Sequence, residues 1–436
     1  MTTTLLDLVD LRAYAGDLDR ALPAPTDATG PIRAVREIIA MVRSRGDAAV
    51  RELTAKFDGA TIDELRVPAS ALAAAWRDTP TALRAALEHA ADAVRAYHET
   101  QVVPPSTADR DGITVRELIV PVARAGCYVP GGRAVYPSTV LMTAVPARVA
   151  GVDEVVMCVP PGSDGAVPAP TLAAAALAGV NEVYRIGGAQ AIAALAYGTE
   201  SIRPVDVIVG PGNVYVALAK KEVAGRVGVD TLAGPSEVVV VADEAADAEQ
   251  VGADLLAQAE HGPGGVAVLV TWHEPLVAAV ESAMARRLVA APRAGEIRAA
   301  LGAGGRAVLV TGPDPALDVV NAIAPEHLEL LTRDADTLVA GVRNAGAVFC
   351  GPWTPAVVGD YLAGVNHVLP TGRTARFASA LRVDTFRKHV HVVRADEPAV
   401  RRVAPDIMAL ADAEGLAEHA RAVALRVDAP VTERAS

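Results

Sequence analysis

The sequence predicts an α/β protein in which parallel sheets are covered by helices. Short valine-rich runs alternate with alanine-rich helical segments, which is the strand–helix–strand pattern of a doubly wound fold. Apolar residues make up 51% of the chain but aromatic residues only 3%, as expected when alanine-rich helices cover parallel sheets. A chain of 436 residues exceeds the usual size of one core, so we expect two or more α/β units.

Composition argues against several classes of partner. The formal net charge of -12 disfavours nucleic acid and anionic membranes, which call for a basic face. No apolar run long enough to span a bilayer is free of glycine, proline and charge, and the N-terminus lacks the apolar core of a secretory signal. The three cysteines, Cys127, Cys158 and Cys350, are far apart and odd in number, so free thiols in a cytoplasmic protein are expected.

The part of the chain before about residue 100 is expected to be mainly helical. Residues 26–98 carry a helical periodicity of alanine, leucine and arginine. Two prolines, Pro104 and Pro105, interrupt this pattern, and a strand is expected at 113–120.

Short buried strands, each followed by an alanine-rich helix, are expected through the middle of the chain. Two of them share the lead-in Gly-Val-Asp/Asn-Glu-Val, at 151–155 and 179–183, which indicates a local βα repeat. The expected strands are 155–159, 183–186, 205–209, 238–241, 266–270, 307–310 and 347–350. From about Phe386 short strands give way to helices around 404–411 and 416–427. The order of the strands does not follow from these patterns.

Three glycine-containing loops follow predicted strands, although none has the spacing Gly-x-Gly-x-x-Gly. They are 130–132 (Pro-Gly-Gly), 187–190 (Gly-Gly-Ala-Gln) and 210–213 (Gly-Pro-Gly-Asn). Glycine lets the backbone approach a phosphate or sugar, and α/β folds bind ligands beyond strand ends. Any one loop could be an ordinary tight turn, but three in one segment favour a nucleotide cleft of unusual design.

Four residues are candidate metal ligands. Gln258 and His261 are three apart on a predicted helix, so an amide oxygen and an imidazole nitrogen leave the same face. Such pairs are common on helices and are mostly solvated. Asp360 lies in a glycine-flanked turn, where it could equally bond its own backbone. His419 lies on the apolar stripe of its helix, so it is expected to point inward or at a partner, and it could also be an ordinary core residue.

The run Pro-Glu-His-Leu-Glu-Leu at 325–330 offers candidate acid–base groups. Adjacent Glu326 and His327 can both titrate near neutral pH if they are buried. The alternative is the start of a helix or strand, on which neighbouring side chains point in different directions.

Together these motifs resemble the histidinol dehydrogenase family. The resemblance rests on 124–138, 209–213, 233–237 (Ala-Gly-Pro-Ser-Glu), 258–261 (Gln-Ala-Glu-His) and 325–330, which occur in the family's order. It implies two incomplete Rossmann-like domains and small, mainly helical terminal segments. The implied domains are an N-terminal helical arm (1–25), a catalytic and metal-binding α/β domain (26–125 and 238–380), an NAD-binding α/β domain (126–237) and a C-terminal helical segment that docks on the partner subunit of a homodimer (381–436).

The resemblance also implies a reaction and its cofactors. The family's zinc enzymes oxidise L-histidinol through L-histidinaldehyde to L-histidine with NAD, in the last steps of histidine biosynthesis. Glu326 would activate water and His327 would act as base. The implied zinc ligands are Gln258, His261, Asp360 and His419, and the implied NAD contacts are Tyr128, Gln190 and Asn213. The implied substrate contacts are Ser236, Gln258, His261, His327, Asp360, Glu414 and His419, while the role of His367 stays open.

Two other functions fit parts of the pattern. A zinc hydrolase could use Glu326 as its base, but it would need neither NAD nor the three glycine loops. A non-enzymatic binding protein would bind ligand without turnover. Within the dehydrogenase reading, Cys127 lies near the cofactor motif and could in principle attack the aldehyde. We expect the route through water and Glu326 instead, since no histidine lies near any cysteine in the sequence.

Overall fold

The computed structural model describes residues 4–22, 30–132, 134–231, 234–262 and 264–428. Arg133, Ala233 and Pro263, which belong to or adjoin the motifs above, lie outside the described residues. The chain divides into two compact units. The large unit contains Met1–Val102 and Val122–Phe386, and the small unit contains Val103–Pro121 and Arg387–Ser436.

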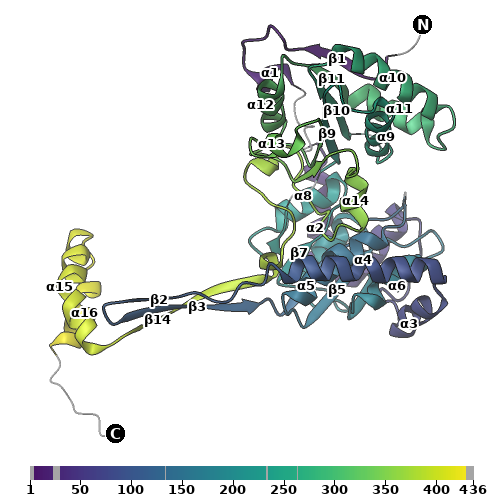
Figure 1. Cartoon of the computed structure of the whole chain (residues 1–436). Coiled ribbons are helices and arrows are strands. Elements are labelled where there is room, and N and C mark those ends of the chain that lie inside the picture. Colours follow the sequence, from purple (N-terminus) through teal and green to yellow (C-terminus); the bar gives the residue numbers. More distant parts are fainter. Residues whose placement is uncertain (1–3, 23–29, 133, 232–233, 263, 429–436) are drawn as a thin grey trace. The chain divides into compact units, whose positions relative to one another are not determined.

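A six-stranded parallel sheet forms one layer of the large unit (Figure 1). Its order is β1 (Asp7–Asp10), β11 (Gly305–Leu309), β10 (Val266–Thr271), β9 (Glu237–Ala242), β12 (His327–Leu331) and β13 (Ala347–Cys350). One face packs against α9 (Ala248–Ala259), α10 (Glu274–Leu288) and α11 (Ala294–Gly304). The other packs against α1 (Leu18–Ala21), α12 (Pro313–Ile323) and α13 (Ala335–Val339). The central strands are valine-rich because both faces of the sheet are buried.

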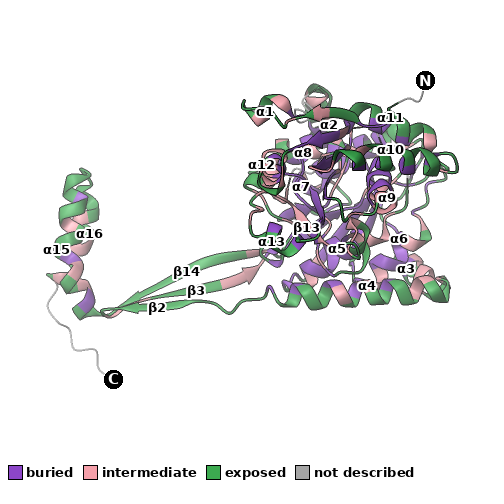
Figure 2. Ribbon diagram, turned by 45° about the horizontal axis from the view of Figure 1, so that its top comes forward, coloured by how far each residue is buried: buried purple, intermediate pink, exposed green. Residues whose placement is uncertain are grey.

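A second parallel sheet, of five strands, lies in the same unit. Its order is β6 (Glu182–Arg185), β5 (Glu154–Val159), β4 (Arg124–Tyr128), β7 (Val207–Val209) and β8 (Gly228–Val229). In chain order this is 3-2-1-4-5, the order of a dinucleotide-binding sheet. One face packs against α3 (Ala69–Asp78), α4 (Thr81–Glu99), α5 (Pro137–Val149) and α6 (Ala169–Leu177). The other packs against α2 (Ile32–Phe57), α7 (Gly188–Tyr197) and α8 (Val214–Val223). Figure 2 shows the buried strands enclosed by helices whose outer faces are exposed.

The small unit is an antiparallel sheet with a helical pair. Its strands are β14 (Arg387–Ala395), β3 (Ile113–Pro121) and β2 (Thr107–Arg110), and its helices are α15 (Glu397–Ala413) and α16 (Ala417–Val427). The Asp396 side chain accepts a hydrogen bond from Ala399 N and so caps α15. Asp396 N donates to the Gly112 carbonyl in the β2–β3 turn, which ties the helices to the sheet.

Most of the expected elements are confirmed. The expected strands correspond to β3, β5, β6, β7, β9, β10, β11 and β13 within about two residues, and the helical region 26–98 forms α2, α3 and α4. Strands β1 and β12 were not expected, and β4 was expected only as the strand before the loop 130–132. All three are short and lack a strict alternation of apolar and polar residues.

The expected domains differ from the structure in four places. Helices α2, α3 and α4 pack on the five-stranded sheet rather than with 238–380, because an apolar helix face does not specify which sheet it will cover. Residues 103–121 pair with β14 and belong to the small unit. The N-terminal segment adds strand β1 to the six-stranded sheet and is not only helical, and 381–436 contains a nine-residue strand before its helices.

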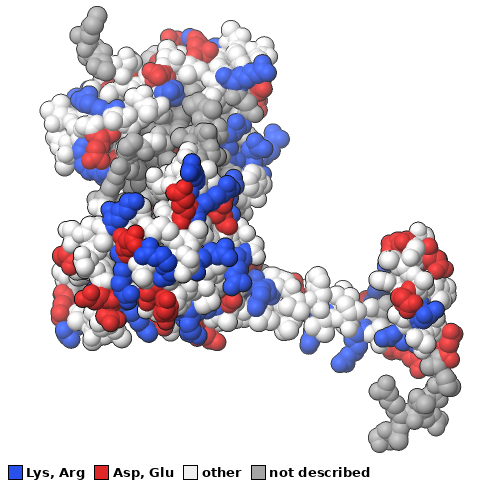
Figure 3. All heavy atoms as spheres, turned by 180° about the vertical axis from the view of Figure 1, so that it is seen from behind, with Lys and Arg blue, Asp and Glu red and all other residues white. Residues whose placement is uncertain are grey.

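The surface carries mixed charge. On the face in view in Figure 3, lysine and arginine side chains are interspersed with aspartate and glutamate. Within the part of the chain that is described, no helix combines the length and apolar character that crossing a membrane requires.

Candidate active site

The candidate catalytic residues lie at the amino ends of two central strands. His327 is the first residue of β12, and it pairs in register with Val238, next to Glu237 at the start of β9. Helix α9 follows β9 and runs back along it, so its last turn returns Gln258 to this edge. Helix α14 (Ala356–Tyr361) brings Asp360 to the same place. Ligand sites usually lie at the carboxyl ends of parallel strands, so this edge could not be chosen from the sequence.

A strained turn places Glu326 beside His327. Helix α12 ends at Ala324, a non-glycine residue with a left-handed φ of 50°, and Pro325 follows it. Glu326 therefore precedes the strand and does not obey its alternation of faces. Its Oε2 lies 3.5 Å from His327 Nδ1, so the alternative in which the two side chains diverge is wrong.

The backbone of Glu237 holds both side chains. Its N–H donates to Glu326 Oε2 at 3.0 Å, and its carbonyl accepts from His327 Nδ1 at 3.1 Å. A proton on Nδ1 leaves Nε2 of a neutral ring free to accept another. That Nε2 is buried, has no hydrogen-bond partner among the described residues and lies 3.6 Å from Asp360 Oδ1.

Aromatic packing fixes the plane of this imidazole. The ring of His327 stacks on Phe349, with centroids 6.0 Å apart. Gly359, beside Asp360, has no room for a side chain, since a Cβ would lie 2.5 Å from Phe349 Cε1. The close approach of α14 to Phe349 therefore requires glycine at this position.

Burial and neighbouring charge shift both titrating groups. Burial raises the pKa of Glu326 to about 7. Burial alone would lower the pKa of His327, but the negative charges of Glu326 and Asp360 outweigh it and raise this pKa to about 9. Glu326 can therefore exchange a proton near neutral pH, as a general base must.

Gln258, His261 and Asp360 form a corner that suits a metal ion. The side chain of Gln258 is buried, and its Nε2 atom has no hydrogen-bond partner among the described residues. His261 Nδ1 is hydrogen-bonded to the Gln258 carbonyl at 3.2 Å, which leaves the opposite ring nitrogen for a ligand. Burial would raise the pKa of Asp360, but the neighbouring imidazole of His327 lowers it, so the carboxylate is ionised.

The donor set of this corner is incomplete within the large unit. An amide oxygen, an imidazole nitrogen and a carboxylate are donors that zinc accepts, and a structural or catalytic zinc site has at least four ligands. Across residues 4–22, 30–132, 134–231, 234–262 and 264–428, no three His, Cys, Asp or Glu side chains gather closely enough to hold a metal by themselves. A site here thus needs ligands beyond Gln258, His261 and Asp360.

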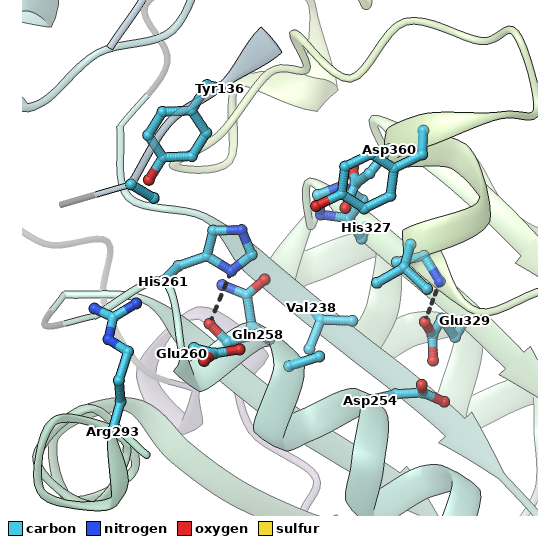
Figure 4. Close-up of a pocket in the computed structure, with 15 residues that line it drawn as sticks. Tyr136, Val238, Asp254, Gln258, Glu260, His261, Arg293, His327, Glu329 and Asp360 are labelled. Carbon is cyan, nitrogen blue, oxygen red and sulfur yellow. Dashed lines mark hydrogen bonds and ion pairs between the residues drawn. The ribbon is translucent and has the colours of Figure 1, made fainter. Parts of the chain in front are cut away.

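These residues line a cavity of about 310 Å³ (Figure 4). In the figure Gln258, His261, Asp360 and His327 surround the same space. Ala134 and Tyr136, which follow β4, close the cavity from the five-stranded sheet. Its volume suits a small molecule.

Two further predicted residues support this corner. The Ser236 carbonyl lies near Gln258, because a Cβ on Gly265 would approach both of them within 3.3 Å. His367 lies behind Asp360, with Nδ1 3.2 Å from the Asp360 carbonyl and Nε2 3.1 Å from Thr139 Oγ1. His367 therefore positions the segment of Asp360 and does not line the cavity.

The predicted cofactor residues gather at the carboxyl edge of the five-stranded sheet. Gly188 N donates to the Tyr128 hydroxyl at 3.0 Å, and Gln190 is buried in the first turn of α7. Asn213 caps α8, where its Oδ1 accepts from two backbone N–H groups. A Cβ on Gly210 would collide with the Tyr128 carbonyl oxygen, so the backbone after β7 passes close to the end of β4 and requires glycine there.

A model of the histidinol dehydrogenase family matches residues 24–427. The chain belongs to the histidinol dehydrogenase family. It is 49% identical to the histidinol dehydrogenase of Heliobacterium mobile over 90% of this chain and 93% of that one. It is 44% identical to that of Methanothermobacter thermautotrophicus over 96% and 98%. A crystal structure of histidinol dehydrogenase from Elizabethkingia anophelis superposes with a TM-score of 0.93, at 31% identity, over 98% of this chain and 99% of that one.

Membership in the histidinol dehydrogenase family makes this chain an oxidoreductase of histidine biosynthesis. The family's activity uses NAD, and the zinc hydrolase alternative is not favoured.

Two predicted residues lie in the small unit. Glu414 directly follows α15, and His419 lies in the first turn of α16. Both are exposed, and none of the described residues of α16 is buried. The inward orientation of His419 that its apolar stripe allowed is therefore wrong for this chain, whereas an orientation toward a partner stays a prediction.

The cysteines do not provide a nucleophile. Cys127 and Cys158 are fully buried in central strands, and burial raises the pKa of Cys127 to about 12. Burial also raises the pKa of the Cys350 thiol. Since the thiolate is the reactive form, the structure agrees with a route through water.

Sequence reasoning missed several polar groups of the site. The Lys220–Asp230 ion pair is buried and holds the loop of the cofactor edge: Asp230 Oδ2 accepts from Gly210 N, and Lys220 Nζ donates to the Gly210 carbonyl. Glu237 and Glu329 were visible as acids within the motifs 233–237 and 325–330. Their roles depend on strand β12, which the sequence pattern did not identify as a strand.

Proposed function

We propose that this chain catalyses two successive NAD-linked oxidations of L-histidinol, through L-histidinaldehyde to L-histidine, with zinc holding the substrate. The observation that supports it best is the convergence of Glu326 and His327 with Gln258, His261 and Asp360 on one cavity. A buried acid–base pair beside a nitrogen and oxygen donor set suits alcohol oxidation on a held substrate.

His327 acts first as the base for the alcohol. Its Nε2 has no hydrogen-bond partner among the described residues, whereas Nδ1 is tied to the Glu237 carbonyl. With its pKa raised to about 9, the ring must first release the proton on Nε2. The neutral ring then takes the hydroxyl proton at Nε2 while the carbon loses a hydride, and the alcohol becomes the aldehyde.

Glu326 acts in the second oxidation. Its ionised carboxylate takes a proton from water, and the water oxygen adds to the aldehyde carbon to give a hydrated form. Loss of a second hydride and of a proton from that form gives the carboxylate product. Because burial brings the pKa of Glu326 to about 7, the proton can leave again between turnovers.

The two cofactors have separate places. NAD, when bound, accepts the hydride at each oxidation, and Tyr128, Gln190 and Asn213 would contact it at the carboxyl edge of the five-stranded sheet. Zinc, when bound, supplies a Lewis acid that holds the substrate, and Gln258, His261, Asp360 and His419 would be its protein ligands. Ser236 and Glu414 would contact the substrate.

We further propose a cytoplasmic homodimer in which the small unit completes the site of the partner. Within the small unit, α15 and α16 expose the apolar side chains of Ile407, Leu410, Leu416 and Leu425. A pair of helices this short cannot bury a core of its own, so this face is suited to a partner surface. The need of Gln258, His261 and Asp360 for a further ligand is met in this arrangement by the partner's His419.

The stoichiometry of NADH tests the proposal. Each histidinol consumed should yield two NADH and one histidine, with little free aldehyde, when absorbance and product analysis are combined. One NADH per histidinol with released aldehyde would contradict the roles of Glu326 and the metal corner. Binding of histidinol without any NADH would favour a binding protein instead.

A further inference from the structure

Two acidic side chains that the reaction does not use face each other in the cavity wall. Asp254 lies on α9, one helical turn before Gln258, and Glu329 lies on β12, two residues after His327 and on the same side of the strand. Both line the cavity, and in Figure 4 Glu329 lies to the right of Val238, with Asp254 beneath it in the view. Their carboxyl groups lie close enough for each to influence the pKa of the other.

Glu329 connects this pair to the helix of Asp360. Its Oε1 accepts a 2.7 Å hydrogen bond from Ala356 N, the first residue of α14. Asp360 is four residues further along that helix, just as Gln258 is four residues beyond Asp254 on α9. The carboxyl pair thus connects α9 and α14. On each helix the connection lies one turn before a candidate metal ligand, Gln258 on α9 and Asp360 on α14.

The close approach of the two buried carboxyl groups favours a proton shared between them. Glu329 is only 1% exposed, and its Oε2 has no donor among the described residues. An ionised carboxylate only accepts hydrogen bonds, so two of them cannot bond unless one is protonated. Burial and the facing charge raise the pKa of Glu329, and burial raises that of Asp254, because two ionised carboxylates in contact repel strongly when desolvated.

We propose that Asp254 and Glu329 share one proton and act as a positioning pair that sets the distance between α9 and α14, and hence between Gln258 and Asp360. The proposal rests on the proposed function, since it takes Gln258, His261 and Asp360 as metal ligands. The pair does not bind the metal. It restricts the positions of two ligands, as residues that surround the ligands of a metal site commonly do.

Substitutions that keep or remove the hydrogen bonds test the pair. In Glu329→Gln the amide oxygen can accept from Ala356 N, and the amide nitrogen can donate to an ionised Asp254. In Asp254→Asn the new amide can donate to Glu329. Both variants should retain zinc within about threefold of the wild type in competition with a chelator. Glu329→Ala and Asp254→Ala remove the bond and should weaken zinc retention by roughly 10–100-fold.

A matched control removes a hydrogen bond on the same helix but away from the cavity. Asp247 is exposed and caps the start of α9. Asp247→Ala should lower thermal stability without changing zinc retention. If Glu329→Ala does not fold, Asp254→Ala carries the test, since alanine suits a helix and leaves the Glu329–Ala356 bond in place. Zinc retention in Asp254→Ala equal to that in Asp247→Ala would overturn the positioning role.

Infrared spectroscopy tests the shared proton without any metal. The wild type at neutral pH should show a carboxylic-acid C=O band that is absent from both Asp254→Asn and Glu329→Gln. Identical bands in all three proteins would refute the shared proton. His261→Asn separates this inference from the proposed function. Unchanged zinc retention in His261→Asn would refute the metal site. If His261→Asn loses zinc and Asp254→Ala retains it, only the positioning pair is refuted.

Discussion

Glu326 should control the pH dependence of the aldehyde-oxidising step. Water activation needs its carboxylate form, and burial raises its pKa to about 7. The ionised fraction is then about one tenth at pH 6 and about nine tenths at pH 8. The rate with supplied histidinaldehyde should therefore rise roughly ninefold across this interval. In Glu326→Gln the rise should disappear and the rate should fall by about 10²–10⁴-fold.

Two assays of NADH formation separate the half-reactions. Histidinaldehyde with NAD reports the second oxidation alone, and a single turnover of histidinol under excess enzyme reports the first. Glu326→Gln should slow the aldehyde reaction far more than the first hydride transfer. Equal and small losses in both assays, or a wild-type aldehyde rate that is flat from pH 6 to 8, would refute the assignment and leave Glu326 as a structural acid.

Four further outcomes are expected. His327→Asn should slow alcohol oxidation by roughly 10²–10⁴-fold in single-turnover assays, and a loss below tenfold would exclude a general base. A chelator should abolish turnover and zinc should restore it, with Asp360→Asn releasing metal more readily on dialysis; full activity without metal would contradict this. Glu326→Gln and His419→Asn, refolded together, should regain about a quarter of wild-type activity if sites are shared between subunits, and no recovery in confirmed heterodimers would mean that His419 serves its own chain. Burial raises the pKa of Glu237 from 4.5 to about 7, so the folded protein holds this proton more tightly than the unfolded chain. The free energy of unfolding should therefore fall by up to about 3 kcal/mol as pH rises from 4.5 through 7. Glu237→Gln should remove this part of the pH dependence in denaturant titrations.

Local patterns determined the class of fold and most of its elements. Valine runs such as Val238–Val241 in β9 predict strands because a strand buried on both faces needs apolar residues throughout. The helical periodicity of 26–98 predicts α2, α3 and α4 because it depends only on neighbours along the chain. The motif residues of the cavity, including Gln258 and His327, were also identifiable, since the family motifs are contiguous in sequence.

Only the tertiary structure decided which surfaces meet. An apolar face specifies that it is buried but not against what, so the docking of α2 to α4 on the five-stranded sheet did not follow from their sequence. Strand order decided that the candidate catalytic residues lie at the amino ends of β9 and β12. The shifted pKa of Glu326 and the Asp254–Glu329 contact arise from desolvation and from groups distant in sequence. Both effects depend on distances in space, which residue order along the chain does not contain.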